Sequence, residues 1–195
     1  VSSVIPWQPA PGRQPEDYFH ASTQLASGRL SILVDPGAWT NLAGKSVARR
    51  MAESAIKAGR SPQQWKMQTP LNIQGVGNGT QECLWETRIP IAVPTEDGSA
   101  EIHFFEAPTV EGSGEELPAL LGLSSMSSKN GLLEMTPGKE RLIFPGKGGY
   151  TIECSPGTQF INLVRPPSGH LVIPCDAFDS VKTEGGLAPA ATTFH

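Results

Sequence analysis

The sequence predicts a mainly β fold with one inserted helix and one further short helix. Glycine and proline are frequent, 21 and 18 of the 195 residues, and show no repeating period. Frequent turn-forming residues, together with the short apolar runs between them, favour many short strands over long helices. The stretch from Lys45 to Ala58 differs, because it lacks Gly and Pro and is rich in good helix formers.

The first predicted elements surround residues 26–29. The ranges 19–25 and 30–34 flank this stretch, and Gly28 suits a turn, so we expect a hairpin. The second arm is apolar on both faces, as is typical of an interior strand. In the predicted helix, four residues share one face and Gly59 marks the end: Val47, Met51, Ala55 and Ala58.

The later elements follow without an internal repeat. We expect strands at 71–74 and 80–93, a turn at 96–99, a strand at 102–105 and an acidic loop at 109–116. A short helix at 124–130, closed by Gly131, then precedes two strands around Pro137-Gly138-Lys139, within 132–144. Strand-like runs recur at 150–152 and 170–173. The predicted organisation is a Pro-rich extended lead-in at 1–16, a main domain at 17–149, a C-terminal strand extension at 150–181 and a flexible tail at 182–195.

Composition excludes several classes of function. The net charge is −4 and no basic run occurs, so we expect no nucleic-acid partner. No apolar stretch approaches the roughly 20 residues that span a membrane. The three cysteines, Cys83, Cys154 and Cys175, are widely spaced and predict reduced thiols in an intracellular, cytoplasmic protein. The four histidines lack metal-ligand spacing, so neither a metal nor a cofactor is expected.

One carboxylate has a distinctive setting. Asp35-Pro36-Gly37-Ala38 directly follows the apolar run that ends at Val34, so a strand delivers Asp35 into a tight glycine turn. Far downstream, Pro118 to Leu123 forms a second apolar run that contains Gly122. A carboxylate held at the end of a strand is a means of presenting an acid at a fixed position.

These two segments resemble the active-site loop of retropepsin-like aspartic proteases. That family is marked by an apolar strand, then Asp-Thr/Ser-Gly-Ala, and later two apolar residues and a Gly. The resemblance covers roughly Phe19 to Phe144. It is closer to proteases of LTR retrotransposons than to viral ones, because Trp39 and Leu123 stand where viral enzymes have an acidic residue and its arginine partner. It implies a retropepsin-like closed β fold with a short helix after the Leu-Leu-Gly loop.

The resemblance also implies an activity and a set of site residues. Asp35 is implied to be catalytic, and Leu121 and Gly122 to support the active-site turn formed by Pro36, Gly37 and Ala38. The implied flap, which closes over substrate in that family, has its tip at Gly75, Val76, Gly77, Asn78 and Gly79. Of the five aspartates only Asp35 has the family's context, so the catalytic pair requires one Asp35 from each subunit of a homodimer. The expected reaction is hydrolysis of an extended peptide, in the processing of a retroelement polyprotein.

Pro36 departs from the family pattern. The family's Thr or Ser uses its hydroxyl and backbone N–H to lock the two catalytic turns together, and proline has neither group. The alternative is therefore a catalytically inactive retropepsin-fold module that dimerises or binds peptides. Asp-Pro-Gly is also common in simple solvated turns. Gly44-Lys45-Ser46 suggests a phosphate-binding loop, but Trp39 stands where that motif needs its first glycine.

Overall fold

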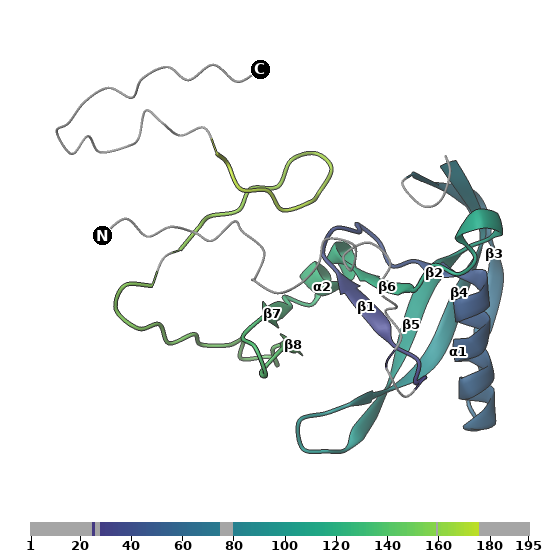
Figure 1. The fold of residues 1–195 in the computed structure, drawn as a ribbon, viewed down its shortest axis with the longest axis horizontal. Coiled ribbons are helices and arrows are strands. Elements are labelled where there is room, and N and C mark those ends of the chain that lie inside the picture. Colours follow the sequence, from purple (N-terminus) through teal and green to yellow (C-terminus); the bar gives the residue numbers. More distant parts are fainter. Residues whose placement is uncertain (1–24, 26–27, 75–79, 159, 176–195) are drawn as a thin grey trace, which may run out of the picture. The chain divides into compact units, whose positions relative to one another are not determined.

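The computed structural model describes residues 25, 28–74, 80–158 and 160–175 (Figure 1). The chain divides into two units, Val1–Gly149 and Tyr150–His195. All helices and strands of the described residues lie in the first unit, and strands predominate, which confirms the predicted mainly β class. No helix among the described residues is both long enough and apolar enough to cross a membrane.

The larger sheet has four strands in the order β2-β5-β4-β3. Three of them pair with one another in antiparallel fashion: β3 (Gln63–Gln74), β4 (Thr80–Pro94) and β5 (Ala100–Val110). The short β2 (Ala43–Gly44) pairs with the end of β5 in parallel. A tight turn joins β4 to β5, and Gly98 adopts a φ of 83° there, a conformation that glycine accepts without strain.

The pairing of β3 with β4 is interrupted. Lys66 lies opposite Trp85 and Leu71 lies opposite Cys83, so residues 67–70 of β3 have only Leu84 across from them. Pro70 falls in this irregular stretch, where its missing N–H costs no ladder hydrogen bond. The irregularity divides β3 into two halves, of which we predicted only the second.

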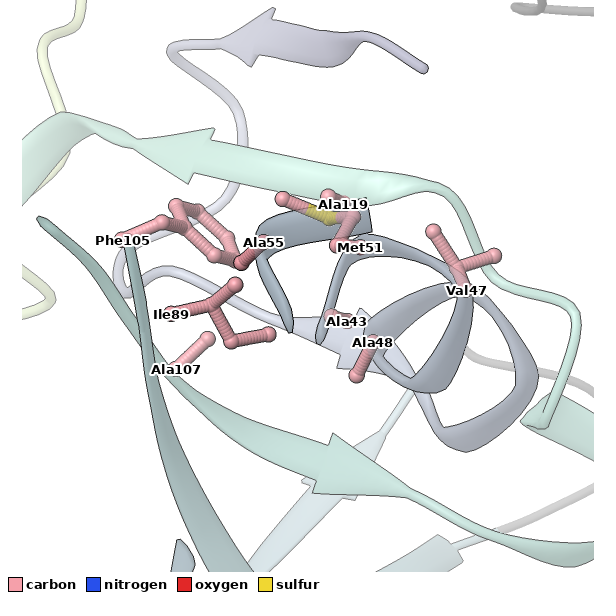
Figure 2. Packing of buried hydrophobic residues seen from close by; sticks show 9 residues of the cluster. All are labelled: Ala43, Val47, Ala48, Met51, Ala55, Ile89, Phe105, Ala107 and Ala119. Carbon is pink, nitrogen blue, oxygen red and sulfur yellow. The ribbon is translucent and has the colours of Figure 1, made fainter. Parts of the chain in front are cut away.

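Helix α1 (Lys45–Lys57) packs on this sheet and forms the core with it (Figure 2). Residues at helical spacing point from α1 toward β4 and β5, and the alanines among them let the helix lie close to the strands. Ile89 and Phe105 are 1% and 3% exposed and supply the largest side chains from the sheet. The nine buried members are Ala43, Val47, Ala48, Met51, Ala55, Ile89, Phe105, Ala107 and Ala119.

Two smaller sheets complete the first unit. Strand β1 (Ile32–Asp35) runs parallel to β6 (Ala119–Gly122), and α2 (Leu123–Ser128) follows β6 directly. Strands β7 (Leu132–Glu134) and β8 (Arg141–Ile143) form a hairpin. Between β5 and β6 lies a single 3-10 turn, Gly112–Gly114.

Several predicted elements are confirmed. The helix at 45–58 is α1, with Gly59 at a φ of 71° beyond its end, and the hairpin around residues 137–139 is β7 and β8. The strands after residue 71 and around 102–105 also form, although both are longer than predicted. The first arm of the hairpin predicted at 19–34 lies almost wholly outside the described residues.

Other predictions were wrong. Thr109 and Val110 belong to β5 and are buried, because they pair with β4 and β2 and do not begin an acidic loop. Ala58 is exposed because α1 ends before it. The short helix predicted at 124–130 is α2, which ends two residues earlier, at Ser128; the Gly131 N–H donates to the Met126 carbonyl at 2.9 Å beyond its end.

We also predicted that the apolar run before Asp35 forms an interior strand, and among the described residues it does not. Leu33 is 39% exposed, because β1 has β6 as its one strand neighbour there. The three sheets of the described residues are separate and form no closed barrel, so the predicted closure is absent from this part of the chain.

The described part of the second unit contains much less β structure than we predicted. Within its described part, 150–158 and 160–175, the one ladder contact is an isolated bridge between Val164 and Val172. Residues 150–152 form no strand, although Tyr150 and Ile152 are apolar. Their side chains are 48% and 57% exposed, so they lack the buried face that turns an apolar run into a sheet strand.

Candidate functional site around Asp35

Asp35 is the last residue of β1. In the parallel ladder its register partner is Gly122, the last residue of β6. Apolar runs precede both residues; the β6 run buries Ala119 and Leu120, and the β1 run, partly exposed, pairs along it. The pairing therefore brings Asp35 and the Leu121-Gly122 pair, identified separately from the sequence, to one end of a small sheet.

The turn after β1 holds the Asp35 carboxylate. Its Oδ1 atom accepts a hydrogen bond from the backbone N–H of Gly37, at 2.9 Å, and a longer one from that of Ala38, at 3.3 Å. The Asp35 carbonyl oxygen also accepts from the Ala38 N–H, at 3.2 Å. A Cβ atom on residue 37 would lie 3.1 Å from Oδ1, so glycine allows the turn to fold tightly against the carboxylate. Neither of the two bonds to the carboxylate needs an N–H from Pro36.

The chain after the turn lies against β6 and the start of α2. The backbone N–H groups of Leu123 and Ser124 donate to the carbonyl oxygens of Ala38 and Trp39, at 2.8 and 2.9 Å. Further along, Leu42 and Leu120 exchange two backbone hydrogen bonds, at 3.3 and 2.7 Å. Strand β6 thus contacts the chain both before the turn, through β1, and after it.

Gly122 occupies a position where no side chain fits. A Cβ atom there would lie 2.5 Å from the carbonyl carbon and oxygen of Thr40, both of them backbone atoms. Real Cβ atoms essentially never approach backbone so closely, so the residue that follows Leu121 must be glycine for the turn to lie where it does. Steric fit explains why this apolar run ends in Gly.

Asn41 is a residue that the sequence did not single out. Its Oδ1 accepts a hydrogen bond from the Gly122 N–H at 3.0 Å, and its Nδ2 donates to the Glu106 carbonyl oxygen at 2.9 Å. The side chain therefore joins β6 to β5 directly behind the turn. An asparagine after a Gly turn gives no local signal of this role, because both partners are distant in the sequence.

The predicted flap tip lies outside the described residues. Residues 75–79 connect β3 to β4, which are paired as far as Gln74 and Thr80. The two strands therefore form a long antiparallel arm on either side of the predicted tip, Gly75, Val76, Gly77, Asn78 and Gly79.

Asp97, the other aspartate among the described residues, serves its own turn. Its Oδ1 accepts hydrogen bonds from the hydroxyls of Thr95, at 2.6 Å, and Ser99, at 2.7 Å, and from the Ser99 N–H, at 3.0 Å. These bonds, that of Thr95 foremost, lower the pKa of the Asp97 carboxyl to about 2. The Asp97 carboxylate therefore stabilises its own turn, between Thr95 and Ser99.

The phosphate-loop alternative finds no support at the start of α1. The backbone N–H of Gly44 donates to the Leu117 carbonyl at 2.9 Å, and that of Ser46 donates to the Glu115 carbonyl at 3.0 Å. Lys45 lies 3.1 Å from a Glu111 carboxylate oxygen. These donors are engaged within the protein, whereas a phosphate loop needs its backbone N–H groups directed at the ligand.

Two hollows border α1, and Asp35 lines neither. One, of about 320 Å³, is lined by Lys45, Ala48, Pro62, Thr87 and other residues. The other, of about 890 Å³, is lined mainly by apolar side chains such as Leu30, Ile32, Met51 and Ile91. Three or more His, Cys, Asp or Glu residues do not gather into a possible metal site anywhere in the described part of the chain.

Comparison with models of known protein families finds no match, and comparison with curated protein sequences finds no significant relative.

Proposed function

We propose that this chain is an aspartic endopeptidase of the retropepsin type, acting as a homodimer that processes a retroelement polyprotein. The observation that carries the proposal is the placement of Asp35. It ends β1 opposite Gly122 and its carboxylate is held by the turn that follows. The sequence resemblance implies a catalytic carboxylate at the end of a strand, supported by a Leu-Leu-Gly run. The half-buried carboxylate of Asp35 fits that expectation.

The chemistry proposed for the dimer uses two carboxylates, one Asp35 from each subunit. Two like charges about 3 Å apart cannot both ionise, so the pair shares one proton and titrates as a unit. The ionised carboxylate removes a proton from water as the water oxygen attacks the scissile carbonyl carbon. The protonated carboxylate polarises the carbonyl oxygen. The C–N bond then breaks, and the carboxyl group that took the proton from water gives it to the leaving amine.

The proposed substrate is an extended peptide. A peptide that lies as a strand beneath the β3–β4 arm would be held by main-chain hydrogen bonds, and pockets for alternate side chains would give specificity. Asp35 lines neither hollow beside α1. In the proposal, therefore, the cleft that covers the substrate is completed by the second subunit.

The second candidate is a retropepsin-fold module that dimerises or binds peptides without cleaving them. Pro36 favours it, because proline lacks the hydroxyl and N–H that lock the two turns together in the family. The turn within one chain does not depend on those groups, since Gly37 and Ala38 supply the bonds to Asp35. The departure therefore bears on the contact between subunits.

One experiment separates the two candidates. The full chain is incubated with a mixture of unfolded peptides from pH 4 to pH 7, and products are read by mass spectrometry. We expect cleavage that is lost in Asp35→Asn and kept in Asp97→Asn, a matched control with the same chemical change at a surface turn. Circular dichroism verifies that both variants fold. Cleavage that persists in Asp35→Asn excludes the peptidase, and peptide binding without cleavage by the wild type supports the module.

A further inference from the structure

We propose that Asn41 is a positioning residue that holds the Asp35 turn in its reactive geometry, an inference that rests on the proposed peptidase function. Asn41 uses both ends of its side-chain amide. The oxygen accepts from the Gly122 N–H at 3.0 Å, and the nitrogen donates to the Glu106 carbonyl at 2.9 Å. One side chain thus ties β5 and β6 to the segment that follows Asp35.

The link from Asn41 to Asp35 passes through Gly122. Gly122 lies opposite Asp35 in the ladder, and the space for a Cβ on Gly122 is filled by the Thr40 backbone. The next residue, Leu123, donates to the Ala38 carbonyl at the end of the turn. A shift of Gly122 therefore moves the partner of Asp35 on one side and the end of its turn on the other.

Asparagine suits this place because it carries a donor and an acceptor on one short, rigid group. Aspartate keeps the acceptor for the Gly122 N–H but loses the donor for the Glu106 carbonyl. Leucine has a similar size and loses both. The two variants therefore separate the bond to Gly122, which leads to the turn, from the bond to Glu106, which leads to the sheet.

The inference predicts an effect on the chemical step more than on substrate binding. A misplacement of a reacting group by about 1 Å costs on the order of 100-fold in rate. We expect Asn41→Leu to lower kcat by about that factor and to leave KM within about threefold. Asn41→Asp should retain kcat to within about tenfold of the wild type, because the Gly122 bond persists. Asn162→Leu, an exposed asparagine in the second unit, is the matched control and should leave both constants unchanged.

A second readout does not depend on activity. Amide hydrogen exchange at Gly37 and Ala38 reports the two bonds to the Asp35 carboxylate, and Asn41 takes part in neither of these bonds. We expect both amides to exchange faster in Asn41→Leu, or in Asn41→Ala where the leucine variant does not fold, because either change removes the bond to Gly122. Asn41→Asp, which keeps that bond, should leave both amides unaltered. A residue that only joined β5 to β6 would change exchange at Gly122 and leave these two amides unaltered.

Two results overturn the inference: a folded Asn41→Leu with kcat within threefold of the wild type, or unchanged exchange at Gly37 and Ala38 in the folded variant. A wild type without Asp35-dependent cleavage contradicts the proposed function instead. In that case the exchange rates still decide whether Asn41 positions the turn.

Discussion

Asp35 and Gly122 lie opposite one another at the ends of two parallel strands, β1 and β6. Asp35 carries the carboxylate of the candidate site, and Gly122 has no side chain. The backbone of Thr40 fills the space beside Gly122, and the turn that holds the carboxylate ends two residues before Thr40. The geometry of the candidate site therefore depends on a contact between backbones that leaves no room for a methyl group.

Replacing Gly122 by alanine should destabilise the fold. The new Cβ would meet the Thr40 backbone at 2.5 Å, and forcing a methyl group into a filled space costs about 1–3 kcal/mol. Gly146→Ala is the matched control, because nothing lies within 4 Å of its added Cβ, and it should change stability by less than about 0.5 kcal/mol. Urea denaturation gives both values, and equal stability of the two variants would contradict the close approach.

The core beneath α1 should depend on Ile89. This side chain is 1% exposed between β4 and the helix, so Ile89→Ala should lower the free energy of unfolding by about 2–5 kcal/mol. Ile56→Ala removes the same atoms from the outer face of α1, where the residue is 59% exposed, and should cost less than about 0.5 kcal/mol. Thermal unfolding followed by circular dichroism compares the two, and similar costs would mean that α1 packs through another face.

The three thiols should differ in reactivity. Cys83 is fully buried, and burial, with a smaller contribution from the nearby negative charge of Glu111, raises the pKa of its thiol. Cys154 and Cys175 are exposed. With a disulfide reagent at pH 8 we expect two thiols to react quickly and the third only on unfolding. The Cys83→Ala variant should lack the slow phase, and three equal rates in the wild type would contradict the burial of Cys83.

The turn at Asp97 should show a depressed pKa. NMR titration of its carboxyl should give about 2 in place of the ordinary 3.8, and Thr95→Val should raise it toward 3.8. Because the folded pKa lies below the unfolded one, the stability that Asp97 contributes is present above about pH 4 and is lost as the pH falls toward 2. Thr151→Val, at an exposed position of the second unit, should leave the titration unchanged, as should Thr95→Val if the hydroxyl bond is absent in solution.

Replacing Pro36 by the threonine that retropepsins carry should strengthen self-association of the proposed homodimer. Pro36→Thr adds a hydroxyl and an N–H to each turn, and each added hydrogen bond of about 1.4 kcal/mol corresponds to a tenfold lower dimer Kd. Pro137→Thr, in the exposed turn between β7 and β8, is the control and should leave the Kd unaltered. Sedimentation equilibrium measures both, and an unchanged Kd in Pro36→Thr would argue against contact between the two turns.

The elements that were predicted correctly are those with strong local signals. Helix α1 combines an apolar face with freedom from Gly and Pro, and it ends at Lys57, two residues before Gly59, so its boundaries follow closely from nearby residues. The hairpin around residues 137–139 is similarly marked by its turn. The first half of β3 was missed because Gln63-Gln64-Trp65-Lys66 shows no apolar alternation, and it becomes a strand by pairing with β4.

The opposite error occurred in the second unit. Residues 150–152 and 170–173 have strand-like composition, yet the described part of this unit contains one isolated bridge, between Val164 and Val172. Apolar residues favour a strand only where another strand and a buried face receive them. Composition alone cannot supply that neighbour.

Features that depend on neighbouring residues can be predicted from the sequence: the mainly β class, the position of α1 and the tight turn after Asp35. Features that depend on distant segments become visible only in the folded chain: the pairing of Asp35 with Gly122, the fit of Thr40 against that glycine, and the two hydrogen bonds of Asn41. The physical reason is the distance along the sequence between the residues that interact. A turn or a helix end is specified by the few residues that form it, whereas steric fit and side-chain bonding between remote strands exist only once the chain has packed.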